Sequence, residues 1–381
     1  MKCHHCHAET QESAHCSVLE AGVTSDCRPW KEEVRIFVCP TCGAVQAPID
    51  ERWRRSVQSI YRDYDTYAAA GGEEQKVAGA DAAGMSARSR VIVEWLASLG
   101  SVPASGEVLD VGCGRGAFLK EFARQCPGWA LSGTEFDDRN LGILQSLPKW
   151  KDLQTAGFED LTGQYDVISM IHVLEHIENP VACLAALRKR ARNGALLLVQ
   201  VPDWRENPFA LAIADHATHF TSSVLQQVAR RAGWEPLTPT SHVVPKELTL
   251  LAKASDTGSG SAGKLDEQSE LRLNERLAWL RGVRHQAQQI RAESDTFGIF
   301  GTAVAGSWLA GACNIKVDFF VDEDPNRIGG EHLGIPIIAP GDVPPGADVF
   351  VGMAPAVSKR LAEKYSGAPA RFRAVEAIGA L

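Results

Sequence analysis

The sequence predicts an α/β protein with two units of alternating strands and helices behind a small cysteine-rich module. Between about residues 107 and 253, short runs rich in Val, Ile and Leu alternate with helical patterns. Such alternation is typical of a mostly parallel sheet covered by helices. The same pattern returns from residue 296, and six of the ten cysteines lie within the first 42 residues.

Composition limits the classes of function. A chain of 381 residues with 45% hydrophobic residues can build two or three domains. The net charge of −8 argues against a nucleic-acid partner. The longest apolar runs, such as "GALLLVQV", are too short to cross a bilayer, and the N-terminus lacks the apolar segment of a secretory signal. We expect a cytoplasmic protein without a membrane partner, either a monomer or a homodimer.

Residues 1–50 hold the cysteine cluster. Cys3-x-x-Cys6 and Cys39-x-x-Cys42 form two short chelating loops, and four thiolates at this spacing suit a tetrahedral Zn²⁺ ion. Without an export signal, clustered cysteines indicate metal binding before disulfides. The ion would be structural. Alternative ligands remain in the same segment: His4, His5, His7, Cys16 and Cys27.

The rest of the chain divides by its patterns. Residues 51–100 predict a helical connector, and residues 101–253 hold the first α/β unit. Residues 254–294 combine a Ser/Gly-rich linker, "ASDTGSGSAGK", with a long helix whose apolar side chains fall on one stripe. Residues 295–381 form the second, smaller α/β unit.

A glycine-rich turn follows the first strand of the larger unit. The strand "VLDV" ends in the turn "GCGRG", which leads into a helix. Glycines allow positive φ and let a ligand lie against the backbone. A dinucleotide-binding loop would read G-x-G-x-x-G, whereas this one reads G-x-G-x-G and is preceded by Asp110. An acid there is unfavourable for a phosphate and favourable for a cationic ligand. Glu135 ends the next strand, where a carboxylate can accept both hydroxyls of a ribose.

This order of strand, D-x-G-x-G-x-G, helix, strand and acid resembles class I methyltransferases that use S-adenosyl-L-methionine (SAM). The resemblance implies a Rossmann-like domain that binds SAM as its cofactor. "GFEDLTGQYDVISM" resembles the segment that passes the adenine, with Glu159 or Asp160 near its amino group. The expected cofactor-binding residues are Asp110, Gly112, Cys113, Gly114, Gly116, Glu135, Phe158, Glu159 and His172.

Two further segments resemble the family's methyl-transfer site. "IHVLEHIENP" follows the fourth strand, and "DHATHFTSSVLQQVARRAGW" resembles an element that brings a histidine over the pocket. The candidate bases are therefore His176, His216 and His219. A histidine with a pKa near neutrality can accept the proton of the acceptor, while the protein aligns the acceptor for direct displacement. Asp215 could orient His216 or cap a turn.

The whole architecture resembles bacterial deoxysugar C-methyltransferases, which join a zinc-binding domain, a SAM domain and a C-terminal Rossmann-like domain. The segment from "GIFGTAVAG" to "GIPII" also resembles the nucleotide-sugar-binding domains of sugar-modifying acyltransferases. Both resemblances imply a small-molecule substrate that is a nucleotide-linked sugar. In this unit, Asp322 is expected either to bind a ribose or to cap the turn that follows it.

One departure concerns the chemistry. The C-methyltransferases carry Tyr-x-Glu-His where this chain has Ile213-Ala214-Asp215-His216, and Ile213 cannot remove a proton. O-methylation of a sugar hydroxyl needs only a base near the hydroxyl and is an equally natural use of His176 or His216. Two alternatives remain: a methyltransferase for another small natural product, and a catalytically silent protein that binds nucleotide sugars.

Overall fold

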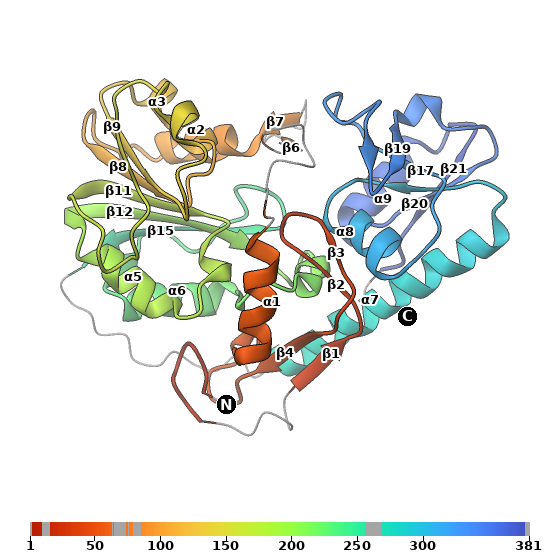
Figure 1. Ribbon diagram of the computed structural model, residues 1–381, viewed down its shortest axis with the longest axis horizontal. Helices are drawn as coiled ribbons and strands as arrows, with labels where there is room; N and C mark the ends of the chain where they lie inside the picture. Colours follow the sequence, from red (N-terminus) through yellow and green to blue (C-terminus); the bar gives the residue numbers. More distant parts are fainter. Residues whose placement is uncertain are drawn as a thin grey trace.

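The computed structural model describes residues 2–9, 16–62, 64, 74, 76–78, 85–255 and 268–377. A seven-stranded sheet, a six-stranded sheet and a four-stranded sheet organise these residues. Figure 1 shows the seven-stranded sheet on one side of the molecule, the six-stranded sheet on the other, and the N-terminal segment between them.

The seven-stranded sheet has the order β10-β9-β8-β11-β12-β15-β14. Its first five strands are parallel, and β15 runs antiparallel to both neighbours. This mixed α/β sheet confirms the predicted Rossmann-like fold. The strands are β8 (Glu107–Val111), β9 (Ala130–Thr134), β10 (Trp150–Gln154), β11 (Tyr165–Ile171), β12 (Ala191–Pro202), β14 (Trp234–Pro236) and β15 (Glu247–Ala254).

Helices cover both faces of this sheet. Strand residues alternate between two cores, so that Val167 faces one core and Ile168 the other. The first core includes α2 and α3, and the second includes α5 and α6, on opposite sides of the sheet in Figure 1. The helices are α2 (Arg88–Ser98), α3 (Ala117–Gln125), α4 (Leu141–Leu144), α5 (Pro180–Arg188) and α6 (Ser222–Arg231).

The edges of the sheet and the connector differ from the expectation. The sequence did not predict β10 and β14, because "WKDLQ" and "WEP" lack the apolar run of a buried strand. The connector also contains more than helices. Between α1 (Glu51–Arg62) and α2 lies a hairpin of β6 (Lys76–Ala78) and β7 (Met85–Ala87).

The N-terminal segment is joined to the larger α/β unit by backbone pairing. Its sheet has the order β1-β4-β5-β13, and β13 (Thr218–His219) belongs to the larger unit. Val23 also forms a parallel bridge with Ile213. The cysteine-rich segment therefore builds one wall of that unit. Its own strands are β1 (Cys16–Leu19), β2 (Gly22–Val23), β3 (Pro29–Trp30), β4 (Val34–Val38) and β5 (Val45–Gln46).

The six-stranded sheet has the order β18-β19-β17-β16-β20-β21, parallel except for β18. The predicted long helix is α7 (Ser269–Glu293), which packs against this sheet (Figure 1). The Ser/Gly-rich linker falls mostly outside the described residues. The elements are β16 (Phe297–Phe300), α8 (Val304–Ser307), β17 (Phe319–Val321), β18 (Glu331–His332), β19 (Ile335–Ile338), β20 (Asp348–Val351), α9 (Pro355–Lys364) and β21 (Arg371–Ala374).

The predicted stripe of α7 is buried at Leu273, Leu277, Leu280, Val283 and Ala287. These side chains join one core with residues of the N-terminal strands and of the six-stranded sheet. Across the part of the chain that the structure describes, no helix combines the length and apolar character needed to span a membrane.

Candidate functional site

The glycine-rich turn lies where the seven-stranded sheet changes direction. β8 pairs with β9 on one side and with β11 on the other, so the order in which the chain adds strands to the sheet reverses beside β8. Ligands of open α/β sheets bind in the crevice at such a point. Gly112, Gly114 and Gly116 have φ values of 68°, 54° and 77°, which glycine adopts without strain. A Cβ on Gly112 would lie 2.6 Å from Val173 Cγ2, so the turn also requires its small size.

Two carboxylates flank this turn, as the sequence predicts. Glu135 Oε1 accepts a hydrogen bond from the Gly114 amide at 2.6 Å, and its Oε2 accepts one from the Phe136 amide at 3.1 Å. Asp110 is 4% exposed and accepts a hydrogen bond from Ser169 Oγ at 2.8 Å. Burial raises the pKa of Asp110 to about 7, and the negative charge of Glu135 adds to this shift.

Neither of these carboxylates forms a salt bridge with a cationic side chain of the described residues. Their partners are backbone amides and one hydroxyl, which are neutral. Above the raised pKa of Asp110, the turn therefore lies beside carboxylates that have no cationic partner among the described residues. This arrangement favours a ligand that carries a positive charge.

The other predicted cofactor residues differ in their surroundings. The Cys113 side chain is buried against Gly133, so it presents only backbone to the crevice. Phe158 is half-buried and packs against the core. Glu159 forms a surface salt bridge of 2.9 Å with Lys189, both side chains being about two-thirds exposed.

His172 directly follows β11 and has a φ of 55°, an uncommon conformation for a residue other than glycine. Its Nδ1 lies 3.2 Å from Glu175 Oε1, and its Nε2 lies 3.0 Å from Glu247 Oε2. Burial alone would lower the pKa of His172, but the two carboxylates outweigh it and raise the pKa to about 9. The imidazole is therefore protonated at neutral pH and has no lone pair with which to accept a proton.

The three candidate bases lie together. The ring centroids of His176 and His216 are 4.8 Å apart, and those of His216 and His219 are 5.8 Å apart. His216 and His219 are at most 4% exposed. Burial lowers the pKa of His219 to about 3 and that of His216 well below its usual range, with the neighbouring histidines adding to the shift of His216. These two imidazoles stay neutral.

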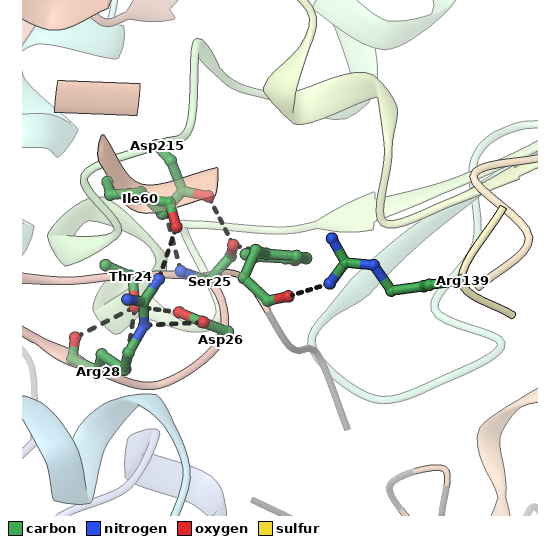
Figure 2. Close-up of polar contacts among 8 residues, drawn as sticks. Thr24, Ser25, Asp26, Arg28, Ile60, Arg139 and Asp215 are labelled. Carbon is green, nitrogen blue, oxygen red and sulfur yellow. Dashed lines mark hydrogen bonds and ion pairs between the residues drawn. The ribbon is translucent and has the colours of Figure 1, made fainter. Parts of the chain in front are cut away.

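His176 is shifted in the opposite direction. Its Nδ1 lies 3.3 Å from Asp215 Oδ2 and 3.2 Å from the Asp215 carbonyl oxygen. Burial opposes the charged form, but the Asp215 carboxylate outweighs it and raises the pKa of His176. The expectation that Asp215 orients His216 is therefore wrong, because the carboxylate contacts His176. Figure 2 shows Asp215 beside Ser25, a residue of the N-terminal segment that sequence reasoning missed.

The four predicted zinc ligands come together. Cys3 Sγ lies 3.7 Å from Cys42 Sγ, and Cys6 Sγ lies 3.6 Å from Cys39 Sγ. All four sulfur atoms lie within 4.8 Å of one another. A tetrahedral Zn²⁺ with bonds of about 2.3 Å separates its sulfur ligands by about 3.8 Å, so the cysteines fit this ion.

Donors around Cys3 also suit a thiolate. The His5 amide and Gln46 Nε2 point to Cys3 Sγ at 3.4 Å and 3.3 Å. The His5 ring is engaged elsewhere, because its Nε2 lies 3.2 Å from Thr218 Oγ1 in β13. His5 therefore connects the cysteine cluster to the strand that carries His219.

The six-stranded sheet has a polar cluster at its own change of direction, where β16 lies between β17 and β20. Thr302 Oγ1 donates to Asp322 Oδ2 at 2.9 Å and accepts from Arg327 Nη1 at 2.8 Å. Asp322 Oδ1 accepts from the Asp324 amide, which caps the following turn. The Arg327 guanidinium is 9% exposed, and its Nε has no hydrogen-bond partner among the described residues.

Comparisons with known proteins find similarity around the glycine turn. Residues 86–238 match the family model described as a methyltransferase domain. This segment is thus similar to methyltransferase domains. The match includes the glycine turn, both carboxylates and the three histidines, and ends before the six-stranded sheet.

Curated relatives match the same region. The ubiquinone biosynthesis O-methyltransferase of Cereibacter sphaeroides (strain ATCC 17025) is 26% identical over 151 residues, which are 34% of this chain and 60% of the relative. The enzyme of that name from Bordetella bronchiseptica is 27% identical over 165 residues, 37% of this chain and 67% of the relative. The chain thus spans about three fifths of the length of the first relatives.

A solved structure is also similar. The 1,6-didemethyltoxoflavin-N1-methyltransferase of Burkholderia thailandensis, which contains bound S-adenosylhomocysteine, is 17% identical and superposes with a TM-score of 0.38. The similarity covers 56% of this chain and 96% of that one.

Proposed function

We propose that this chain is a SAM-dependent methyltransferase. The observation that carries the proposal is the uncompensated pair Asp110 and Glu135 around the Gly112–Gly116 turn, within the methyltransferase domain. Asp110 would favour the cationic methionine part of SAM, and Glu135 would accept the ribose hydroxyls. When bound, SAM supplies a methyl group made electrophilic by the positive sulfonium.

His176 is the general base in this proposal. Asp215 occupies its Nδ1 side and favours the imidazolium that forms when the base takes a proton. His216 and His219 are neutral but have weakly basic rings, since their pKa values are lowered. Their role is to shape the pocket wall beside His176.

The acceptor is, in this proposal, a sugar or a nucleotide-linked sugar. The cluster of Thr302, Asp322 and Arg327 supports it, because Arg327 Nε has no hydrogen-bond partner among the described residues and can donate to an anionic oxygen of a nucleoside diphosphate. The chemistry favoured is O-methylation. Ile213 stands where the sugar C-methyltransferases have tyrosine, and here it is 7% exposed and bridged to Val23.

A second candidate is O-methylation of a small molecule that is not a sugar. The names of the curated relatives favour it, since those proteins are O-methyltransferases of ubiquinone biosynthesis. In that case the six-stranded sheet would cover the methyltransferase domain without binding a nucleotide.

A structural Zn²⁺ on Cys3, Cys6, Cys39 and Cys42 completes the proposal. The ion would hold the N-terminal segment against β13 through β5 and would take no part in methyl transfer. Metal analysis of the purified chain should find one zinc ion per chain, and a content near zero would contradict this part.

Calorimetric titration with SAM tests the cofactor, and titration with UDP- and TDP-sugars tests the acceptor class. We expect saturable SAM binding, and transfer of label from methyl-labelled SAM to a nucleotide sugar. A chain that binds nucleotide sugars but not SAM would instead be a catalytically silent binding protein. Binding of SAM without any affinity for nucleotide sugars would favour the second candidate.

A further inference from the structure

We propose that the N-terminal loop Thr24–Arg28 is part of the catalytic site, with Ser25 and Asp215 acting as positioning residues for His176. The inference rests on the proposed function, in which His176 is the base. It adds a residue from outside the methyltransferase domain, because Ser25 precedes residues 86–238.

The contacts of His176 fix its tautomer. Both atoms beside Nδ1 are acceptors, the Asp215 carbonyl oxygen at 3.2 Å and Asp215 Oδ2 at 3.3 Å. Nδ1 must therefore carry the proton, which leaves the lone pair of the neutral ring on Nε2. The nitrogen that faces away from Asp215 is the one able to accept a proton.

Ser25 makes the buried carboxylate of Asp215 tolerable. Asp215 is fully buried, and a charge in such a place needs several hydrogen-bond donors. The Ser25 amide donates to Asp215 Oδ1 at 2.9 Å, and Ser25 Oγ donates to Oδ2 at 2.5 Å. The Tyr64 hydroxyl lies 3.2 Å from Ser25 Oγ, within hydrogen-bond distance.

The loop that carries Ser25 is held on both sides (Figure 2). Arg28 Nε donates to Asp26 Oδ2 at 2.8 Å, and Arg28 Nη2 donates to the Ile60 carbonyl oxygen at 2.7 Å. Thr24 Oγ1 donates to Asp26. On the other side, the Ala214 amide donates to the Val23 carbonyl oxygen at 2.9 Å. Contacts within the loop and with Ile60 and Ala214 thus hold the Ser25 donors beside Asp215.

Other groups face His176 and contribute to its titration. Glu175 adds a negative charge, which acts in the same direction as Asp215. The His216 ring is 4.8 Å away, and the Tyr61 ring from α1 is 6.3 Å away, both edge to face. None of these groups contacts Nδ1, so the tautomer depends on Asp215 and the donors that hold it.

Nuclear magnetic resonance of the ¹⁵N-labelled full chain tests the proposal without an acceptor. The His176 signals are assigned by their absence in His176→Asn. We expect the wild type to show Nδ1–H and a bare Nε2. Asp215→Asn should lower the pKa of His176 by about one unit, because the negative charge beside Nδ1 is lost. Ser25→Ala should shift the pKa of His176 by about half a unit, because Asp215 loses one of its two donors from Ser25.

Ser25→Thr keeps the hydroxyl and should restore the wild-type pKa, which a merely structural role for the side chain would not predict. Ser17→Ala, in β1 of the same segment, is the matched control and should change nothing. A wild type with the proton on Nε2, or an unchanged His176 pKa in both Asp215→Asn and Ser25→Ala, would overturn the proposal. If Asp215→Asn does not fold, the Ser25 pair decides.

Titration of the same samples with SAM distinguishes failure of the positioning role from failure of the proposed function. Unchanged SAM affinity together with unchanged His176 signals would leave the proposed function standing and remove the positioning role. Failure of the folded wild type to bind SAM would remove the proposed function itself, whatever the histidine signals show.

Discussion

The two large sheets carry similar turns but opposite electrostatics. In each, a glycine follows the central strand and an acid follows its neighbour: Gly112 with Glu135, and Gly301 with Asp322. Within the described residues, Asp110 and Glu135 accept hydrogen bonds from neutral donors, whereas Asp322 contacts the Arg327 guanidinium at 3.4 Å. The same backbone arrangement can therefore select a cationic ligand in one unit and an anionic ligand in the other.

Removal of the Asp110 charge should have the largest effect on ligand binding. Asp110→Asn should weaken SAM binding about 10- to 100-fold at pH 8, because a charge-assisted contact contributes about 1.5–3 kcal/mol. Calorimetric titration measures the change. Asp152→Asn, in the edge strand β10 of the same sheet, is the control and should bind SAM normally.

The ligand-free Asp110→Asn chain should also be more stable than the wild type at pH 8. The pKa of Asp110 is raised on folding, so the stability it contributes is present below its unfolded pKa of about 4 and is lost as the pH rises through about 7. Thermal unfolding at pH 6 and pH 8 measures this. Equal destabilisation of the variant at both values would contradict a buried, ionising Asp110.

The pH dependence of SAM binding should also follow the ionisation of Asp110. Only the ionised carboxylate attracts the ligand, and the pKa of Asp110 in the free chain is about 7. Affinity should fall about tenfold from pH 8 to pH 6, with one proton released on binding at the lower pH. Titrations in buffers of different ionisation enthalpy count that proton, and a flat profile would exclude Asp110 as the titrating group.

Binding of an anionic ligand by the unit with the six-stranded sheet should depend on Arg327. Arg327→Gln should weaken UDP-sugar binding about tenfold while leaving SAM affinity unchanged, because the guanidinium lies in the other unit. Lys359→Gln, an exposed lysine of α9, is the matched loss of a positive charge. Equal losses in the two variants would indicate a general charge effect and not a site at Thr302.

Local motifs explain which parts of the molecule the sequence predicts. The turn from Asp110 to Gly116 and Glu135 are fixed by adjacent strands, so their spacing alone places them. The clustering of the four cysteines could be predicted because paired cysteines at chelating spacing are typical of a metal site. The contact between Ser25 and Asp215 joins residues 190 positions apart and leaves no local pattern. Pairing of His176 with Asp215 depends on that tertiary contact, which is why the sequence suggested His216.

Substitutions in the cysteine cluster should have the smallest effect on SAM binding. They test whether cofactor binding is independent of the packing of His176, His216 and His219. The knuckle Cys39–Cys42 leads directly into β5, which pairs with β13 and so positions His219. The glycine turn makes no part of this connection. Cys39→Ser should therefore lose zinc and broaden the His219 signals, yet change SAM affinity less than about threefold.

Metal analysis, the histidine spectrum and a SAM titration on one preparation measure all three quantities. Cys126→Ser is the control, since Cys126 ends α3 and lies outside the cluster. A loss of SAM affinity as large as that of Asp110→Asn would mean that the N-terminal segment also supports the cofactor crevice. The separation holds only if zinc loss disturbs β13 while the acids around Gly112–Gly116 keep their ligand. Asp110 lies in β8 and Glu135 directly follows β9, and among the described residues neither strand pairs with the N-terminal sheet.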